Sequence, residues 1–147
     1  QDERVVCMER TNFRYMTPEN LEKGTPEFSC IDVSFISLKI IFPVLKTLLA
    51  KEGEIVALIK PQFEAGREQV GKKGIIKDPK VHISVVEDIL NFITALDLSV
   101  LGLTYSPIKG GEGNIEFLVH IGYNEDKRTC VSEQDIVNVV KEAHSQL

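Results

Sequence analysis

The sequence lacks tryptophan and contains only three cysteines among its 147 residues. Cys7, Cys30 and Cys130 are odd in number and widely spaced, which argues against a disulfide framework. No CxxC pair or cysteine–histidine cluster suggests a zinc site, so we expect no bound metal. Cys7 and Cys30 fall in apolar runs, and we expect them to be small buried side chains in the reducing cytoplasm.

Long apolar runs and an excess of positive charge are also missing. The longest apolar run, residues 40–45, is far shorter than the roughly 20 residues that cross a bilayer. The net charge of −5, from 17 basic and 22 acidic residues, excludes a surface that is basic throughout but permits a local basic patch. The chain opens Gln1-Asp2-Glu3-Arg4 without an initiator methionine or a signal peptide, so we expect a fragment of a cytoplasmic protein.

Strand-like and helix-like segments alternate along the chain. Apolar runs predict strands at residues 28–35, 54–60, 98–104 and 115–123, preceded by the end of another at 5–8. Periodic apolar residues predict helices over residues 38–49, 78–96 and 132–143, with a turn at 124–128. Asp78 and Ser132 are predicted helix caps, and Pro43 predicts a kink or a late start in the first helix. The whole chain, residues 1–147, therefore reads as one α/β unit with a mostly parallel sheet, an antiparallel last strand and helices on both faces.

Charged residues stand where two successive strands end. Asp32 lies inside the apolar run 28–35, and Lys60 ends the strand 54–60. Because ligands bind beyond the carboxyl ends of parallel strands, this pair can face a site, although a simple ion pair at the sheet edge explains it equally well. Glu116 points opposite to its apolar neighbours, and the pattern alone favours a solvent-facing acid there.

One stretch of the chain, residues 60–80, concentrates positive charge. Six basic residues minus three acidic ones give it a local charge of +3 in a chain of −5. A solvated loop is one interpretation, and a loop that contacts phosphates beside the strand ends is the other.

Three strings carry a resemblance: IDVSFISL (31–38), LIKPQFEAGREQVGKKGIIKDPKVH (58–82) and SPIKGGEGNIEFL (106–118). They resemble the TlyA family, whose members are named hemolysins and are similar to FtsJ-type, S-adenosylmethionine-dependent ribose 2′-O-methyltransferases acting on ribosomal RNA. The resemblance runs from about Val5 to Ile121 and includes ERTNFRYMTPE (9–19). It implies a partial Rossmann-like methyltransferase fold. The chain would be the C-terminal portion of that domain, with an S4-type RNA-binding domain and a glycine-rich first βαβ unit expected upstream.

The resemblance also assigns residues by position. The family uses a Lys–Asp–Lys–Glu catalytic set, which implies Asp32, Lys60 and Glu116 here, with the first lysine upstream of Gln1. The implied cofactor-binding residues are Asn12, Phe13 and Asp32. The candidate contacts to the RNA backbone are Arg67, Lys72, Lys73 and Lys109.

The chemistry of methyl transfer agrees with this set. Transfer from a sulfonium to a ribose hydroxyl is an in-line displacement that needs alignment of oxygen, methyl and sulfur. A lysine can take the hydroxyl proton only if its pKa falls well below the usual value of about 10.4. We predict that Lys60 is the base or the hydroxyl-orienting group. Asp32 would position it and the cofactor, and Glu116 would orient a lysine or the ribose.

The absent first half creates a problem at the sheet edge. The strand 28–35 would become a long apolar edge, which is an aggregation hazard. We expect an N-terminal segment, a partner chain such as a second copy, or rearrangement of residues 1–27 to cover it. The fragment alone is expected to be catalytically incomplete. Two other functions stay open: a membrane-active hemolysin, and a non-catalytic RNA-binding module on the methyltransferase scaffold.

Overall fold

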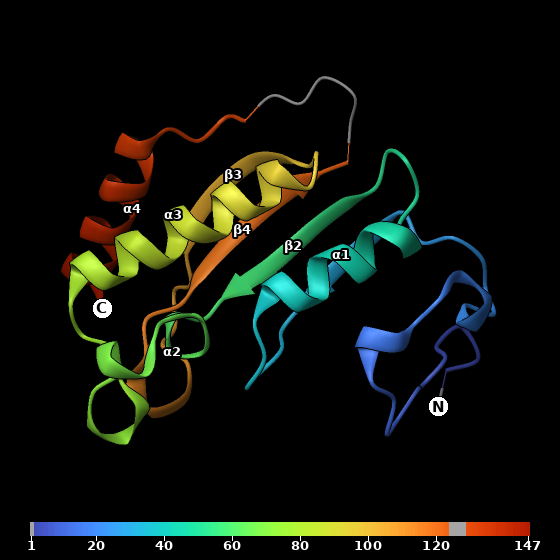
Figure 1. Cartoon of the computed structure of the whole chain (residues 1–147), viewed down its shortest axis with the longest axis horizontal. Helices are drawn as coiled ribbons and strands as arrows, with labels where there is room; N and C mark the ends of the chain where they lie inside the picture. The colour runs from blue at the N-terminus through green and yellow to red at the C-terminus, as the bar shows by residue number, and fades with distance from the viewer. Residues whose placement is uncertain (1, 124–128) are drawn as a thin grey trace.

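The computed structural model describes residues 2–123 and 129–147, which form a four-stranded sheet with helices packed against it (Figure 1). The strands are β1 (Phe28–Ile31), β2 (Glu54–Ile59), β3 (Ser99–Tyr105) and β4 (Phe117–Gly122), in the spatial order β1-β2-β4-β3. β1 and β2 are parallel, whereas β4 is antiparallel to both of its neighbours. The α/β class and the antiparallel last strand are therefore confirmed.

Four helices accompany the sheet: α1 (Leu38–Leu48), α2 (Pro61–Glu64), α3 (Pro79–Ala95) and α4 (Glu133–Gln146). The predicted caps are confirmed, since Asp78 accepts from the Lys80 backbone N–H at 2.9 Å and Ser132 from that of Asp135 at 3.1 Å. α1 begins at Leu38 and runs through Pro43, so the late start is wrong. Among the described helices, none is both long and apolar enough to cross a membrane.

Short 3-10 turns join these elements. They are η1 (Phe13–Tyr15), η2 (Pro18–Asn20), η3 (Arg67–Gln69), η4 (Lys72–Gly74) and η5 (Gly111–Gly113). The stretch between β2 and α3 is thus a chain of tight turns instead of a plain loop. The predicted turn at 124–128 lies outside the described residues.

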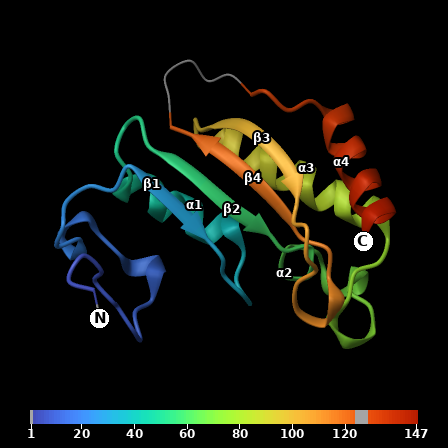
Figure 2. The same cartoon turned by 180° about the vertical axis from the view of Figure 1, so that it is seen from behind.

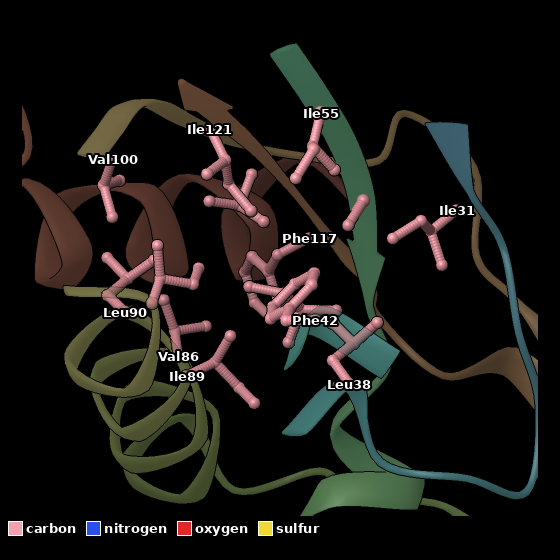
Figure 3. Close-up of a cluster of buried hydrophobic side chains, with 14 of the residues drawn as sticks. Ile31, Leu38, Phe42, Ile55, Val86, Ile89, Leu90, Val100, Phe117 and Ile121 are labelled. Carbon is pink, nitrogen blue, oxygen red and sulfur yellow. The ribbon is translucent and has the colours of Figure 1, made fainter. Parts of the chain in front are cut away.

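The helices lie on one side of the sheet. α1 and α3 pack behind the strands in Figure 2, and α4 lies beyond the β3 edge, against α3. Phe42 of α1 and Ile89 of α3 meet Phe117 and Ile121 of β4 in the core (Figure 3). Along β2 and β4 buried residues alternate with half-buried ones, which is the burial pattern of a sheet covered on one face. The expectation of helices on both faces is therefore not met among residues 2–123 and 129–147.

The start of the chain differs most from its prediction. β1 covers four residues instead of eight, so the predicted long edge is short, although the apolar Phe28 and Cys30 on it are exposed. Residues 5–8 form no strand, and η1 packs beside α1. An apolar run in the sequence does not by itself show whether a neighbouring strand is available, and residues 5–8 pair with none of the four described strands. Cys7 is exposed as well, so the prediction of buried cysteines is wrong.

A pair of histidines, the buried His82 and the half-buried His144, joins α3 to α4. Nδ1 of His82 lies 2.8 Å from Nε2 of His144, and Nε2 of His82 lies 3.2 Å from the carbonyl oxygen of Ile76. Because a carbonyl can only accept, His82 donates to Ile76 and accepts from His144. Burial of the ring, and repulsion from a protonated His144, lower the pKa of His82 to about 4.

We expect acid to weaken the fold through His82. Its pKa is lower in the folded chain than the unfolded value of about 6.5, so its contribution is complete above pH 6.5 and is lost as the pH falls toward about 4. Urea unfolding near pH 7 and near pH 4 measures the loss, to which His82 should add about 3 kcal/mol. His82→Gln removes the titrating ring, and an unchanged pH dependence in that variant would contradict this account.

Candidate active site

Two strand ends bring the first predicted pair together. Asp32 follows β1 and Lys60 follows β2, and the two strands are parallel neighbours. The ammonium of Lys60 forms an ion pair with the carboxylate of Asp32 and lies 3.4 Å from the hydroxyl oxygen of Ser34. The Lys60 side chain is only 12% exposed, whereas that of Asp32 is 68% exposed. The pair is therefore shielded on the lysine side and open on the carboxylate side.

Glu116 reaches the same place from the opposite direction. The last residue of β2, Ile59, pairs with the first residue of β4, Phe117, so Lys60 and Glu116 both lie just outside this end of the ladder. Glu116 is only 6% exposed. Its carboxylate accepts from the side-chain amide of Gln62 at 3.0 Å. The interpretation of Glu116 as a solvent-facing acid is therefore wrong.

A cavity of about 340 Å³ opens at this end of the sheet. Lys60, Gln62 and Glu116 lie in its wall, together with the turns η4 and η5. Lys60 thus pairs with Asp32 and also lines the cavity whose wall contains Glu116. The predicted catalytic residues converge, with Gln62 as an addition that no sequence pattern singled out.

A second cavity of about 770 Å³ adjoins the first through Phe35 and Phe63, which line both. Phe35 is 89% exposed and has a φ of 61°, in the left-handed region that non-glycine residues rarely adopt. Its ring lies 4.8 Å from the Phe63 ring, centroid to centroid. A large exposed aromatic held in a strained backbone conformation is typical of a functional surface.

The candidate RNA-binding residues divide into two groups. Arg67 lines the larger cavity and Lys73 the smaller one. Lys72 and Lys109 are exposed but line neither of these two cavities. All four can reach solvent, which a contact to a phosphate backbone requires.

The predicted cofactor residues also separate. Asn12 lines the larger cavity, although its side-chain oxygen accepts from the Arg14 backbone N–H at 3.0 Å. Phe13 is partly buried and packs against the core instead of lining that cavity. Asp32 has an exposed carboxylate but is not among the residues that line this cavity, so of the three predicted cofactor residues only Asn12 lies in its wall.

Asn114 clamps the two turns that line the smaller cavity. Its side-chain oxygen accepts from the backbone N–H of Ile76 at 3.0 Å, and its amide donates to the carbonyl oxygens of Gly74 at 2.8 Å and Gly111 at 3.2 Å. The residue is 2% exposed, so these bonds are shielded from water. Asn114 therefore fixes η4, which carries Lys73, against η5.

Comparison with known proteins places these residues in a family. Residues 1–123 match the model of the FtsJ-like methyltransferases. The chain is 56% identical to YqxC of Bacillus subtilis, whose name describes a candidate rRNA methyltransferase, over all of this chain and 53% of that protein. It is 34% identical to the 16S/23S rRNA (cytidine-2′-O)-methyltransferase TlyA of Mycobacterium tuberculosis, over 99% of this chain and 53% of that protein.

Solved structures give the same result for the fold. A hemolysin-named protein from Streptococcus thermophilus superposes with a TM-score of 0.94 at 47% identity, over 99% of this chain and 52% of that one. The chain spans about half the length of the curated relatives it matches. The resemblance to TlyA is confirmed, while the position of the chain within the domain and the roles of its residues stay predictions.

Replacing Asn114 should loosen the wall of the smaller cavity. Asn114→Ala leaves the Ile76 N–H and two carbonyl groups without this partner, and we expect a loss of about 1–3 kcal/mol in the free energy of unfolding. Urea denaturation measures this loss, and limited proteolysis should show faster cleavage near Lys72 and Lys73. The exposed Asn91→Ala on α3 is the control, and an equal effect in both variants would contradict the clamp.

Proposed function

Because the chain belongs to the FtsJ-like methyltransferase family, we propose that it acts in an S-adenosylmethionine-dependent ribosomal RNA ribose 2′-O-methyltransferase. Within that enzyme it would form part of the methyltransferase domain, with a glycine-rich unit and an S4-type domain elsewhere in the protein. One observation carries the proposal: the shielded Lys60 pairs with Asp32 and shares a cavity wall with Glu116.

Lys60 handles the proton of the ribose 2′-hydroxyl. As an ammonium beside Asp32 it donates to and orients the hydroxyl oxygen, and it accepts the proton only in its neutral form. Glu116 is a buried carboxylate on the same wall and orients the ribose or a lysine. Alignment of the hydroxyl for in-line attack is the main contribution of this wall.

S-adenosylmethionine supplies the methyl group on a sulfonium. In the proposed site Asn12 and Phe13 border its adenine and Asp32 its polar groups, each on the evidence of position in the family. Asp32 thereby faces two ways, toward the cofactor with its exposed side and toward Lys60 with the ion pair. The carboxylate of Asp32 would thereby fix the position of Lys60 relative to the cofactor.

The RNA side of the site is the cavity mouth. Phe35 offers a flat exposed ring on which a nucleobase can stack, and Lys73 and Arg67 flank it with positive charge. Lys72 and Lys109 extend this basic rim. The partner is ribosomal RNA or a ribosomal subunit, which implies action in the cytoplasm. A preceding segment or a second copy would cover the free edge of β1.

Lys60→Ala should remove methyl transfer. We expect a fall of about 10²–10⁴-fold in the rate constant for transfer to ribosomal RNA, because the proton-handling group is gone. The protein assayed is the full-length enzyme, with labelled S-adenosylmethionine as methyl donor. The exposed Lys141→Ala on α4 is the matched control.

The same assay separates the other two functions. A wild-type protein that binds ribosomal RNA but transfers no methyl group, with binding unchanged by Lys60→Ala, would support the non-catalytic RNA-binding module. Release of dye from liposomes by the purified protein would instead support a membrane-active hemolysin.

Lys72 and Lys73 should contribute to RNA binding through their positive charges. Replacing both with alanine removes two phosphate contacts, so RNA binding should weaken by a similar factor for all sequences. The plot of log affinity against log salt should become shallower by about two. Binding titrations over a range of potassium chloride measure both effects, and the exposed Lys51 provides a control substitution. An unchanged salt slope would exclude this turn from the RNA interface.

A further inference from the structure

We propose that Gln62 and Gly110 are positioning residues that form a slot for the carboxylate of Glu116, and that this slot sets the rate of methyl transfer. The inference rests on the proposed function for its kinetic part only. Neither residue was singled out by the sequence, and neither touches the reacting atoms in the proposed mechanism. Both act through Glu116.

Gln62 forms the first side of the slot. Its Nε2 donates to Oε2 of Glu116 at 3.0 Å. The reverse orientation of the amide would place its carbonyl oxygen against an oxygen of Glu116 and give up this hydrogen bond. The Oε1 atom of Gln62 is buried and has no hydrogen-bond donor within the described parts of the chain. A buried carbonyl without a donor costs about 1–3 kcal/mol, so the orientation of Gln62 favours Glu116 over its own complete hydrogen bonding.

Gly110 forms the second side. A Cβ atom built on Gly110 would lie 2.8 Å from Oε1 of Glu116 and closer still to Oε2 and Cδ. No side chain can stand there while Glu116 keeps its place. The backbone of Gly110 is extended, with a φ of −80°, so close approach and not an unusual conformation requires glycine at this position. The next residue, Gly111, has no described atom within 4 Å of an added Cβ.

Together the two residues confine a buried carboxylate in one orientation. Gln62 comes from α2, directly after Lys60, and Gly110 precedes η5. The slot therefore ties the position of Glu116 to the same chain segment that carries Lys60. A displaced carboxylate would misalign the ribose hydroxyl, and misplacement by about 1 Å can cost on the order of 10²-fold in rate.

Two glycines provide a matched experiment. Gly110→Ala should lower kcat for methyl transfer on the order of 10²-fold, with KM for RNA changed less than about threefold. Gly102→Ala on β3, outside the site, should leave kcat within about twofold of wild type, since a Cβ atom built there meets only Cβ of His120, at an ordinary 3.8 Å. Circular dichroism and thermal unfolding of both full-length variants verify the fold. Equal kcat values for the two folded variants would overturn the proposal.

A second experiment does not need activity. In Gln62→Glu, two carboxyl groups lie about a hydrogen bond apart, and one of them should keep its proton to higher pH. The ¹³C carboxyl signals of Glu116 and of the introduced glutamate, followed by NMR, should show this shared proton, so that at least one of the two titrates at higher pH than the Glu116 signal of the wild type. The exposed Gln134→Glu on α4 should leave the Glu116 signal unmoved. Two carboxyl signals that both titrate no higher than the wild-type Glu116 signal would overturn the slot.

The kinetic counterpart of that variant is its pH profile. Gln62→Glu should lose activity as the pH rises and the second carboxyl ionises, because the protonated carboxyl at position 62 can donate to Glu116 and the ionised one repels it. Gln62→Leu should remain slow at every pH because it adds no titrating group. A protein that transfers no methyl group in any form refutes the proposed function, and the NMR titration still decides whether Gln62 faces and positions Glu116.

Discussion

The site depends on one feature of the sheet: β4 runs antiparallel between β2 and β3. Strands β1 and β2 deliver Asp32 and Lys60 at their carboxyl ends. An antiparallel neighbour begins where they end, so Glu116, just before β4, arrives at the same edge. A parallel β4 would place Glu116 at the far end of the sheet, about 20 Å away for a strand of this length. The three charged residues meet because of a strand direction and not because of their spacing in sequence.

Charge at this edge is costly, and the structure limits the cost in two different ways. Lys60 is shielded, but its partner Asp32 stays in contact with water, so only one member of the pair loses its hydration. Glu116 is buried without a described cationic partner and is held by the neutral amide of Gln62. A neutral donor stabilises an anion less than a lysine would.

Sequence reasoning succeeded where local chemistry decides structure. The predictions of α3 and α4 were close to the observed bounds. They used the caps Asp78 and Ser132 and the periodic apolar residues that follow each cap, and a helix start depends on residues within about four positions of one another. Sequence reasoning failed where the pairing of strands determines the structure. The run FSCIDVSF looks like one long strand, yet β1 ends at Ile31, opposite Ala57, although β2 continues to Ile59. The approach of Gly110 to Glu116 could not be predicted either, since a contact between a loop and a strand end leaves no periodic signal.

In the smaller cavity, the backbone connects the basic rim to the wall that contains Glu116. Asn114 holds η4, and hence Lys73, by hydrogen bonds to Gly74 and Ile76, and it stands two residues before Glu116. A displacement of η4 would therefore also displace the start of β4, while Gln62 of α2 holds the carboxylate of Glu116. Two discrete arrangements would be needed for true switching, and only one is seen among the described residues. The connection is best understood as rigidity: hydrogen bonds from Asn114 hold the basic turn, and a hydrogen bond from Gln62 holds the carboxylate of Glu116.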